Sequence, residues 1–407
     1  MARKKKHRWQ EENIKQALKK RRVLLLTGAR QCGKTTLAQA IVSSDCEYRT
    51  LDDNSLLKMA RAEPEEFIEH TKKTMIIDEV QRVPDLLLAI KKAVDVNTRY
   101  GQFLITGSAD IQALPTVQES LAGRVKNIRL RPFAYGEILE QTARFFSRLR
   151  QKDFVRNTGF NKKKVIALAL RGGFPEPLLL GQRDSRDWYK DYINTLIQKD
   201  LKDFAQIKRQ RALRELFAVS AAYSSRYMNK DKIRAKLGLA RQTVDEYLNI
   251  LENIYLLDIV PAWSKTDRGR IGRQAKLYLN DTGLLAAILR WQAADVLQDS
   301  NKLGNLIETF VYNQIAAQAE LSADINLYHY RDYDNHEIDL VIEHPAGLTG
   351  VEVKASSRFT EEHFKNLRWF ARNYRGAKFS GIVLYTGELA MSFKDNMHLV
   401  PINNLWE

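Results

Sequence analysis

The sequence predicts an α/β protein built from several domains. Between about residues 21 and 140, apolar runs alternate with helical stretches, a pattern typical of a mostly parallel sheet covered by helices. Helical, charge-rich segments follow, and strand-like alternation of polar and apolar residues returns near the C-terminus. A chain of 407 residues also exceeds one core of ordinary size, which favours two or three domains.

Shifts in pattern and composition divide the chain into five predicted segments. They are a basic N-terminal arm (1–20), a phosphate-binding α/β core (21–140), a helical lid (141–205), a winged helix-turn-helix (206–295) and a C-terminal α/β domain (296–407). The lid is expected to cover the nucleotide.

A phosphate-binding loop follows the apolar strand 23–26. Its glycines let the backbone aim successive N–H groups at phosphate oxygens, while the Lys reaches the β and γ phosphates and the Thr hydroxyl holds Mg²⁺. The helix that follows turns its positive N-terminus to the phosphates. Lys34 also serves catalysis, and Thr35 holds the metal. The predicted ATP-binding residues of this loop are Gly28, Ala29, Arg30, Gln31, Cys32, Gly33, Lys34, Thr35 and Thr36.

Two carboxylates end the next buried run, residues 74–77. We assign Asp78 to Mg²⁺, through water, and Glu79 to orienting or deprotonating the attacking water; a helix N-cap is the alternative use of such a pair. A third strand ends in small polar residues at the same edge of the sheet. Ser108, or alternatively Thr106, is expected there to sense the γ phosphate, although a strand running into a Gly turn has the same pattern.

Arg124 is the candidate arginine finger. Phosphoryl transfer is accelerated by an Arg that stabilises the developing charge, often one from a neighbouring subunit. A surface ion pair with Glu119 is the alternative. An arginine finger from a neighbouring subunit is consistent with a homo-oligomeric ring, which we expect for this protein, with a hexamer as one candidate.

Together these segments resemble the bacterial and archaeal AAA-type ATPases that carry a C-terminal domain of unknown function. The resemblance rests on the phosphate loop and on the stretches IIDEVQ, FLITGS and LAGR, and it extends to residues 171–176 and 277–284. It implies an AAA-like ATPase fold with ATP and Mg²⁺ as cofactors, and it leaves the biological role open.

The net charge of +16 and pI near 9.6 favour a polyanionic partner, for which DNA is the natural candidate. The two cysteines make no disulfide framework, and no apolar run approaches the roughly 18 to 20 residues that span a bilayer. We therefore expect a cytoplasmic protein with no membrane partner.

A helix-turn-helix is predicted within residues 231–254. Gly238 ends its first helix, where a left-handed cap is expected, and the second helix can enter a major groove with its N-terminal residues. The basic loop 268–273 would act as a wing. Packing and assembly without DNA contact is the alternative role. The predicted DNA contacts are Arg241, Gln242, Thr243 and Arg270.

A second chemical site is predicted in the C-terminal domain. Two alternating strands within residues 337–354 place Asp339, Glu352 and Lys354 on one face. Two carboxylates can hold Mg²⁺, and a nearby Lys can activate a metal-bound water for attack on a phosphodiester. Glu308, on an upstream helix, would complete the metal site.

These four positions resemble the helix-borne acid, the Asp and the E-x-K of the PD-(D/E)xK nuclease superfamily over about the last hundred residues, with Ile338 in place of the usual Pro. The leading hypothesis is an ATP-hydrolysing protein that acts on DNA, with a Mg-dependent nuclease-like or DNA-binding C-terminal domain. A nucleotide-switched signalling or scaffold protein with a non-catalytic binding module is the alternative. Protein remodelling would require an aromatic pore loop, which we do not identify in the sequence.

Overall fold

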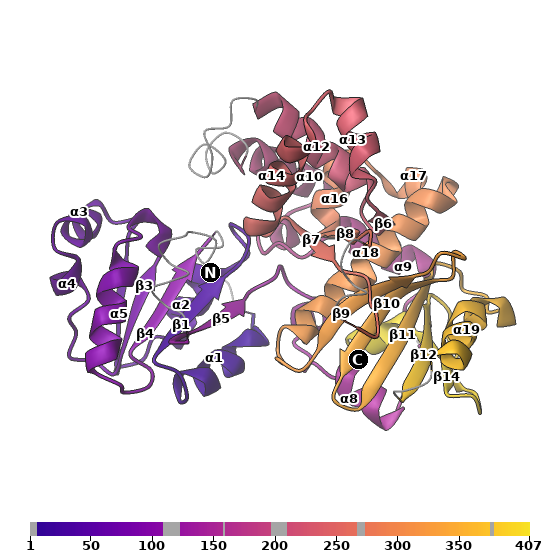
Figure 1. Ribbon diagram of the computed structural model, residues 1–407, viewed down its shortest axis with the longest axis horizontal. Coiled ribbons are helices and arrows are strands. Elements are labelled where there is room, and N and C mark those ends of the chain that lie inside the picture. Colours follow the sequence, from indigo (N-terminus) through magenta and orange to yellow (C-terminus); the bar gives the residue numbers. More distant parts are fainter. Residues whose placement is uncertain (1–5, 109–122, 158, 197–209, 267–272, 375–377) are drawn as a thin grey trace. The chain divides into compact units, whose positions relative to one another are not determined.

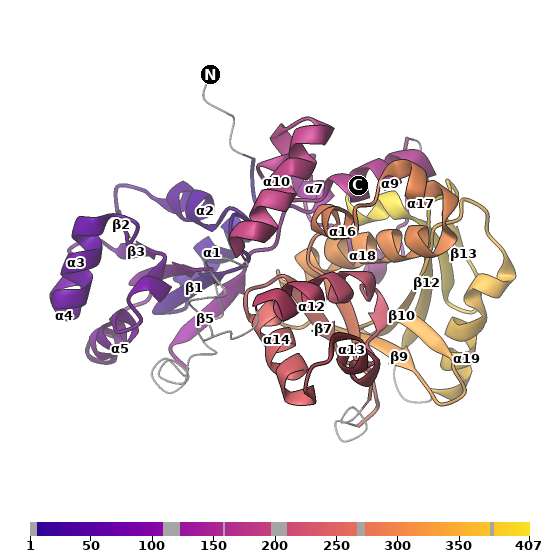
Figure 2. The same cartoon turned by 90° about the horizontal axis from the view of Figure 1, so that it is seen from above.

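The computed structural model describes residues 6–108, 123–157, 159–196, 210–266, 273–374 and 378–407. The chain separates into two compact units, shown in Figures 1 and 2: Met1–Pro132 with Asn253–Tyr255, and Phe133–Glu252 with Leu256–Glu407. The predicted lid, helix-turn-helix and C-terminal domain all belong mainly to the second unit. We describe each unit by itself.

The first unit is built on a five-stranded sheet in the order β2-β3-β4-β1-β5, in which every pair is parallel. The central strands β1, β3 and β4 are buried along their whole length, as their apolar sequences predict, whereas β2 and β5 at the edges are partly exposed. The predicted parallel α/β sheet is therefore confirmed. Its strands are β1 (Val23–Thr27), β2 (Cys46–Thr50), β3 (Thr74–Asp78), β4 (Phe103–Gly107) and β5 (Val125–Arg129).

Helices cover both faces of this sheet (Figure 1). On one face, Leu25, Ile77 and Ile105 pack with Phe67 and Ile90 in a continuous apolar cluster that includes α3, α4 and α5. The other face carries α1 and α2, which pack against β1, β3, β4 and β5. Burial of both faces explains why the central strands are continuously apolar. The helices are α1 (Gln10–Leu18), α2 (Lys34–Ile41), α3 (Asn54–Ala62), α4 (Pro64–Phe67) and α5 (Leu86–Val96), with the 3-10 turn η1 (Val80–Arg82).

Most of the predicted N-terminal arm is part of this unit. Arg8 is buried, and its guanidinium donates hydrogen bonds to the carbonyl oxygens of Cys32 at 3.0 Å and Arg131 at 2.6 Å. Trp9 and Ile14 are buried as well. A buried guanidinium needs such acceptors, so Arg8 ties the start of the chain to the phosphate-binding loop.

The first half of the second unit is helical and contains a small sheet. The antiparallel strands β6 (Arg226–Tyr227), β7 (Leu257–Val260) and β8 (Lys276–Leu279) lie in the order β6-β8-β7. The helices of this half are α7 (Tyr135–Ile138), α8 (Phe145–Gln151), α9 (Lys162–Arg171), α10 (Gln182–Thr195), α12 (Gln210–Ala222), α13 (Lys230–Leu237), α14 (Arg241–Asn253), α16 (Thr282–Leu289) and α17 (Ala293–Gln298), with the 3-10 turn η3 (Pro177–Leu179).

The second half centres on a mixed six-stranded sheet in the order β13-β14-β12-β11-β10-β9. Strands β10 and β11 pair antiparallel with Leu340 opposite Val351, which confirms the predicted hairpin. Figure 2 shows the long helix α18 and helix α19 on opposite sides of this sheet. The elements are α18 (Ser300–Ala319), β9 (Asn326–Arg331), β10 (Glu337–His344), β11 (Gly347–Lys354), η5 (Glu361–Phe364), α19 (Lys365–Asn373), β12 (Phe379–Tyr385), β13 (Met391–Ser392), β14 (Met397–Pro401) and η6 (Ile402–Leu405).

One buried carboxylate joins two distant segments of the second unit. Oδ1 of Asp281 accepts hydrogen bonds from the Leu284 N–H at 2.7 Å, which caps α16, and from the Tyr189 hydroxyl at 2.9 Å. Its Oδ2 accepts the Gly173 N–H at 2.6 Å. A Cβ at Gly172 would lie 2.4 Å from Oδ1, so only glycine fits there. The predicted lid is thus joined to α16 by Asp281.

Replacing Asp281 with Ala should lower the free energy of unfolding by about 3 kcal/mol, because it leaves the buried N–H groups of Gly173 and Leu284 without this acceptor and leaves the Tyr189 hydroxyl only the Arg171 carbonyl oxygen. Asp299→Ala is the matched control, since Asp299 caps α18 through the N–H groups of Asn301 and Lys302. It should cost about 1 kcal/mol. Denaturant unfolding of both variants measures the difference, and equal losses would contradict the role given to Asp281.

Candidate functional site

The phosphate-binding loop connects β1 to α2, as the sequence predicts. Gly28 and Gly33 have φ angles of 149° and 104°, which side chains rarely adopt. Gly33 caps α2, so the first N–H groups of that helix lie in the loop. Of the other predicted residues, Ala29 and Cys32 are buried, Thr35 is partly buried, and Arg30, Gln31 and Thr36 are exposed.

The Lys34 ammonium lies inside the loop. It donates hydrogen bonds to the carbonyl oxygens of Gly28 at 3.0 Å and Ala29 at 2.9 Å, and the residue is 4% exposed. A helix N-terminus and an enclosed ammonium form an anion-binding site. The residues present therefore fit the triphosphate that the loop pattern predicts.

Asp78 is held by the two strands that flank its own. Its Oδ2 accepts a hydrogen bond from the Tyr48 hydroxyl at 2.9 Å, and its Oδ1 accepts one from the Thr106 hydroxyl. Burial, followed by the charge of Asp78, raises the pKa of Tyr48 to about 12. Tyr48 was not predicted from the sequence, because it is the middle residue of β2 and reaches Asp78 only across the pairing of β2 with β3.

Glu79 belongs to the same network. Its N–H donates to the Thr106 hydroxyl at 3.1 Å, and the Gln81 side-chain amide donates to the Glu79 carboxylate and, at 3.1 Å, to the Ser108 hydroxyl. Burial raises the pKa of Glu79, against the opposing charge of Lys34. Among the described residues, the Glu79 side chain makes no capping hydrogen bond to η1. Gln81, also missed from the sequence, connects the two residues predicted for water and γ phosphate.

Arg124 lies at the far end of the sheet from the loop of its own chain. It immediately precedes β5, whose first residue pairs with the first residue of β1, whereas the phosphate loop follows the last. Its guanidinium pairs with Asp95, with Nη2 and Oδ2 separated by 3.1 Å. The alternative partner, Glu119, lies outside the described residues. Within one chain, Arg124 therefore does not reach the loop.

The predicted helix-turn-helix corresponds to α13 and α14. Gly238 ends α13 with φ 61° and donates its N–H to the Arg234 carbonyl, so the expected left-handed cap is confirmed. Helix α14 begins at Arg241. Arg241 and Gln242 are exposed and Thr243 is partly buried. Arg270 lies outside the described residues.

A basic groove that the sequence analysis missed lies between α10, α12 and the end of α16. It has a volume of about 830 Å³ and includes Trp291 in its lining. In the described part of the chain, one carboxylate, Asp187, lines it and pairs with Lys190 at 2.9 Å. Arg183, Arg186 and Lys190 recur at helical spacing along α10, and this pattern in the sequence could have indicated one basic helix face. The basic side chains that line the groove are Arg183, Arg186, Lys190, Arg214 and Arg290.

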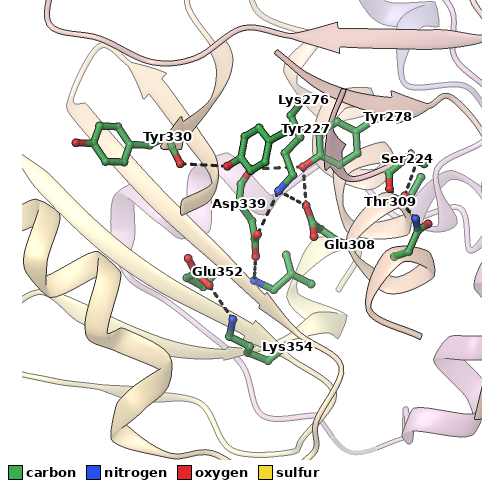
Figure 3. A network of polar contacts seen from close by, with 12 residues as sticks. Ser224, Tyr227, Lys276, Tyr278, Glu308, Thr309, Tyr330, Asp339, Glu352 and Lys354 are labelled. Atoms are coloured by element: carbon green, nitrogen blue, oxygen red, sulfur yellow. Dashed lines mark hydrogen bonds and ion pairs between the residues drawn. The ribbon is translucent and has the colours of Figure 1, made fainter. Parts of the chain in front are cut away.

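A buried cluster of charges lies where the C-terminal site was predicted (Figure 3). Glu308 comes from α18, and Asp339 from β10. Between them lies Lys276 of β8, whose Nζ is 2.5 Å from Glu308 Oε1 and 3.2 Å from Asp339 Oδ1. The Tyr278 hydroxyl donates to the same Glu308 oxygen at 2.8 Å. Lys276 was not predicted from the sequence, although Lys276 and Tyr278 alternate with leucines on one strand and so share a face.

The E-x-K residues of β11 form a second pair in the cluster. Lys354 donates to Glu352 Oε2 at 2.8 Å, and the Val353 N–H donates to Asp339 Oδ2 at 2.9 Å. Burial, then the charge of Asp339, raises the pKa of Glu352 to about 8. Although burial acts to raise it, the charges of Lys276 and Lys354 hold the pKa of Asp339 below its ordinary value.

The fold and the loop together define the class of the first unit: it is an AAA-type P-loop ATPase domain. Residues 20–139 match the family model described as "AAA domain". Residues 162–295 match "Domain of unknown function (DUF8612)", and residues 303–405 match "Domain of unknown function (DUF4143)". The division at about residue 300 coincides with the start of α18.

The chain is similar to two curated proteins, "Uncharacterized protein Mb2031c" of Mycobacterium bovis and "Uncharacterized protein Rv2008c" of Mycobacterium tuberculosis. Each is 28% identical over 393 residues, which cover 96% of this chain and 82% of the relative. Among solved structures, the Walker-type ATPase PABY2304 of Pyrococcus abyssi aligns with a TM-score of 0.43 and 14% identity, over 69% of this chain and 94% of that one. Of the described helices, none combines the length and the apolar character that crossing a membrane requires.

The raised pKa of Glu352 predicts a pH dependence of stability. The pKa of Glu352 is about 8 in the folded protein and near the ordinary 4.5 in the unfolded chain. Between pH 4.5 and 8, the Glu352 carboxyl group is therefore protonated in the folded state and ionised in the unfolded state. The free energy of unfolding should therefore fall as pH rises from about 5 to 8. Glu352→Gln should reduce this fall, and the remainder comes from Glu308, whose pKa burial raises to about 7. Glu337→Gln, at a more exposed position of β10, should leave the fall unchanged. Parallel curves for wild type and Glu352→Gln would contradict the prediction.

Proposed function

We propose that this protein hydrolyses ATP in its first unit and uses the hydrolysis to act on DNA bound by its second unit, in the cytoplasm. The observation that carries the proposal is the polar network beside the phosphate loop, at the carboxyl ends of β3 and β4, which Tyr48 of β2 joins. Tyr48, Asp78 and Thr106 form one half of this network, and Glu79 and Gln81 form the other.

Each residue of the ATP site has a role that follows from its contacts. The Lys34 ammonium donates hydrogen bonds to carbonyl oxygens of the loop, and when ATP binds it donates to the β and γ phosphates instead. Glu79, with a pKa raised by burial, orients the attacking water and accepts its proton. Gln81 holds the Glu79 carboxylate toward Ser108, which contacts the γ phosphate.

Mg²⁺ fits the same site. The Thr35 hydroxyl and the Asp78 carboxylate would hold it, and it would neutralise charge on the β and γ phosphates. The hydroxyl groups of Tyr48 and Thr106 fix the orientation of Asp78 by donating to one oxygen each. A carboxylate has about four lone-pair sites, so Asp78 retains acceptor capacity for metal-bound water beside these two donors.

Arg124 acts on the nucleotide of a neighbouring subunit. Its position at the amino end of β5, paired with Asp95, removes it from its own loop and places it on the opposite edge of the sheet. A homo-oligomeric ring, a hexamer being one form, would bring this edge to the loop of the next copy. An Arg supplied in this way by another subunit raises kcat by about 10³- to 10⁵-fold.

Glu79→Gln should keep ATP binding and lower kcat by about 10²- to 10⁴-fold, because it removes the general base. Gln81→Ala should lower kcat about tenfold with little change in KM, because Glu79 loses its orienting donor. Steady-state hydrolysis and fluorescent-nucleotide binding measure both effects. Lys58→Ala, on α3, is the control. A Glu79→Gln protein with wild-type kcat would refute the assignment.

The basic groove between α10, α12 and α16 supports DNA as the partner, together with the net charge of +16. Arginines and lysines along such a groove neutralise backbone phosphates, which is how most non-specific affinity arises. The exposed start of α14, at Arg241 and Gln242, supports a second contact in the major groove. Arg270 and Thr243 would extend that contact.

The double variant Arg186→Glu/Arg290→Glu should weaken DNA binding at least tenfold and reduce the slope of log K against log salt, because two phosphate contacts are lost. Arg241→Ala should change the preference between DNA sequences more than the salt slope. Fluorescence anisotropy between about 50 and 200 mM salt resolves both effects. ATP hydrolysis by the same proteins should be unchanged. Unaltered DNA affinity in the double variant would exclude the groove.

A second candidate is a nucleotide-switched scaffold protein whose C-terminal domain is a non-catalytic binding module. The observation that favours it is Lys276, which lies among the carboxylates predicted to bind Mg²⁺. If ATP alone, without DNA, makes the protein assemble, as measured by light scattering, this candidate is favoured. DNA-dependent stimulation of ATP hydrolysis would favour the first.

A further inference from the structure

The carboxylate cluster of the C-terminal domain has a cation of its own. The Lys276 side chain is only 4% exposed, and its ammonium lies 2.5 Å from Glu308 Oε1 and 3.2 Å from Asp339 Oδ1. The rings of Tyr227 and Tyr278 lie 5.7 and 5.8 Å from Nζ, a distance at which ring faces stabilise a cation. Figure 3 shows Lys276 pointing between the two carboxylates.

A metal ion that bridged Glu308 and Asp339 would need the same space. Mg²⁺ and Ca²⁺ bind carboxylate oxygens at about 2.0 to 2.6 Å, and Nζ already lies 2.5 Å from the Glu308 oxygen. The other oxygen of Asp339 accepts the Val353 N–H, and Glu352 is paired with Lys354. Among the described residues, the group of three whose ligand atoms lie within 4.8 Å of one another is Asp332, Asp334 and His336, not the predicted trio.

The charges lead to the same conclusion. With all groups ionised, three carboxylates face two ammonium groups, so the cluster is close to neutral. A divalent cation added to it would create a net positive charge in a buried site, which is strongly unfavourable. Without Lys276, the same carboxylates would carry an excess of negative charge that a divalent cation would neutralise.

We infer that Lys276 is the resident cation of the C-terminal site: its ammonium takes the place between Glu308 and Asp339 that the sequence assigns to Mg²⁺. The domain thus retains the charged positions of a nuclease-like site and fills the metal position with a side chain from β8. The inference goes beyond the proposed function, because it defines which cation the C-terminal site takes.

Divalent-metal binding to the full-length, nucleotide-free protein tests the inference, with Mn²⁺ as the probe and electron paramagnetic resonance as the measurement. Wild type and Asp339→Asn should bind Mn²⁺ equally weakly. Lys276→Met should gain one site per chain, at least tenfold tighter, and Lys276→Met/Asp339→Asn should lose it. Lys354→Met is the matched control, because it removes the other ammonium of the cluster and leaves Lys276 in place; it should gain no such site.

The inference would be overturned if wild type bound Mn²⁺ tightly and Asp339→Asn abolished that binding. This comparison leaves Lys276 unchanged in both proteins. A Lys276→Met protein that folds and gains no site would overturn it as well. Lys276→Gln keeps a donor for Glu308 and replaces Lys276→Met if that variant does not fold. Thermal unfolding gives a second reading: Mn²⁺ should raise the Tm of the Lys276 variant and not that of wild type. These measurements of Mn²⁺ binding and thermal unfolding do not depend on ATP hydrolysis or DNA binding. If they contradict the inference about Lys276, the proposed function is therefore unaffected.

Discussion

The buried charge of Lys276 constrains how the strands and helices of the second unit pack. An ammonium with a side chain 4% exposed must have counter-charges, and it finds them on α18 and β10. The strand that carries it, β8, belongs to the small sheet β6-β8-β7, whose strands lie before and after α13 and α14 in the chain. One lysine therefore links that sheet to the C-terminal sheet and decides which cation the carboxylates hold.

The ATP site depends on a different constraint, the parallel order of its strands. Because β2, β3 and β4 are neighbours and run in one direction, their carboxyl ends meet at one edge. Asp78 and Thr106 come from the ends of β3 and β4, and Tyr48, from the middle of β2, joins them in one hydrogen-bonded group. The same order places Arg124, which immediately precedes β5, at the edge of the sheet opposite the phosphate loop of its own chain.

Local pattern was enough to predict the first sheet, the phosphate loop and the β10–β11 hairpin. Each rests on residues close in sequence, such as Gly28 to Thr36, whose chemistry is contained in their spacing. The partners Tyr48, Gln81 and Lys276 were missed, because each is defined by contacts across strands or helices. Lys276 lies 32 residues before Glu308 and 63 before Asp339, so their meeting depends on tertiary packing. The basic groove is likewise assembled from three helices.

We propose that the protein takes a divalent cation at its ATP site and a lysine at its C-terminal site. A crystal structure with Mn²⁺ and a non-hydrolysable ATP analogue, measured at the manganese absorption edge, distinguishes the two sites. We expect an anomalous peak beside Thr35 and Asp78, and continuous density for the Lys276 ammonium between Glu308 and Asp339. A manganese peak on Asp339 and Glu352, with Lys276 displaced, would contradict it.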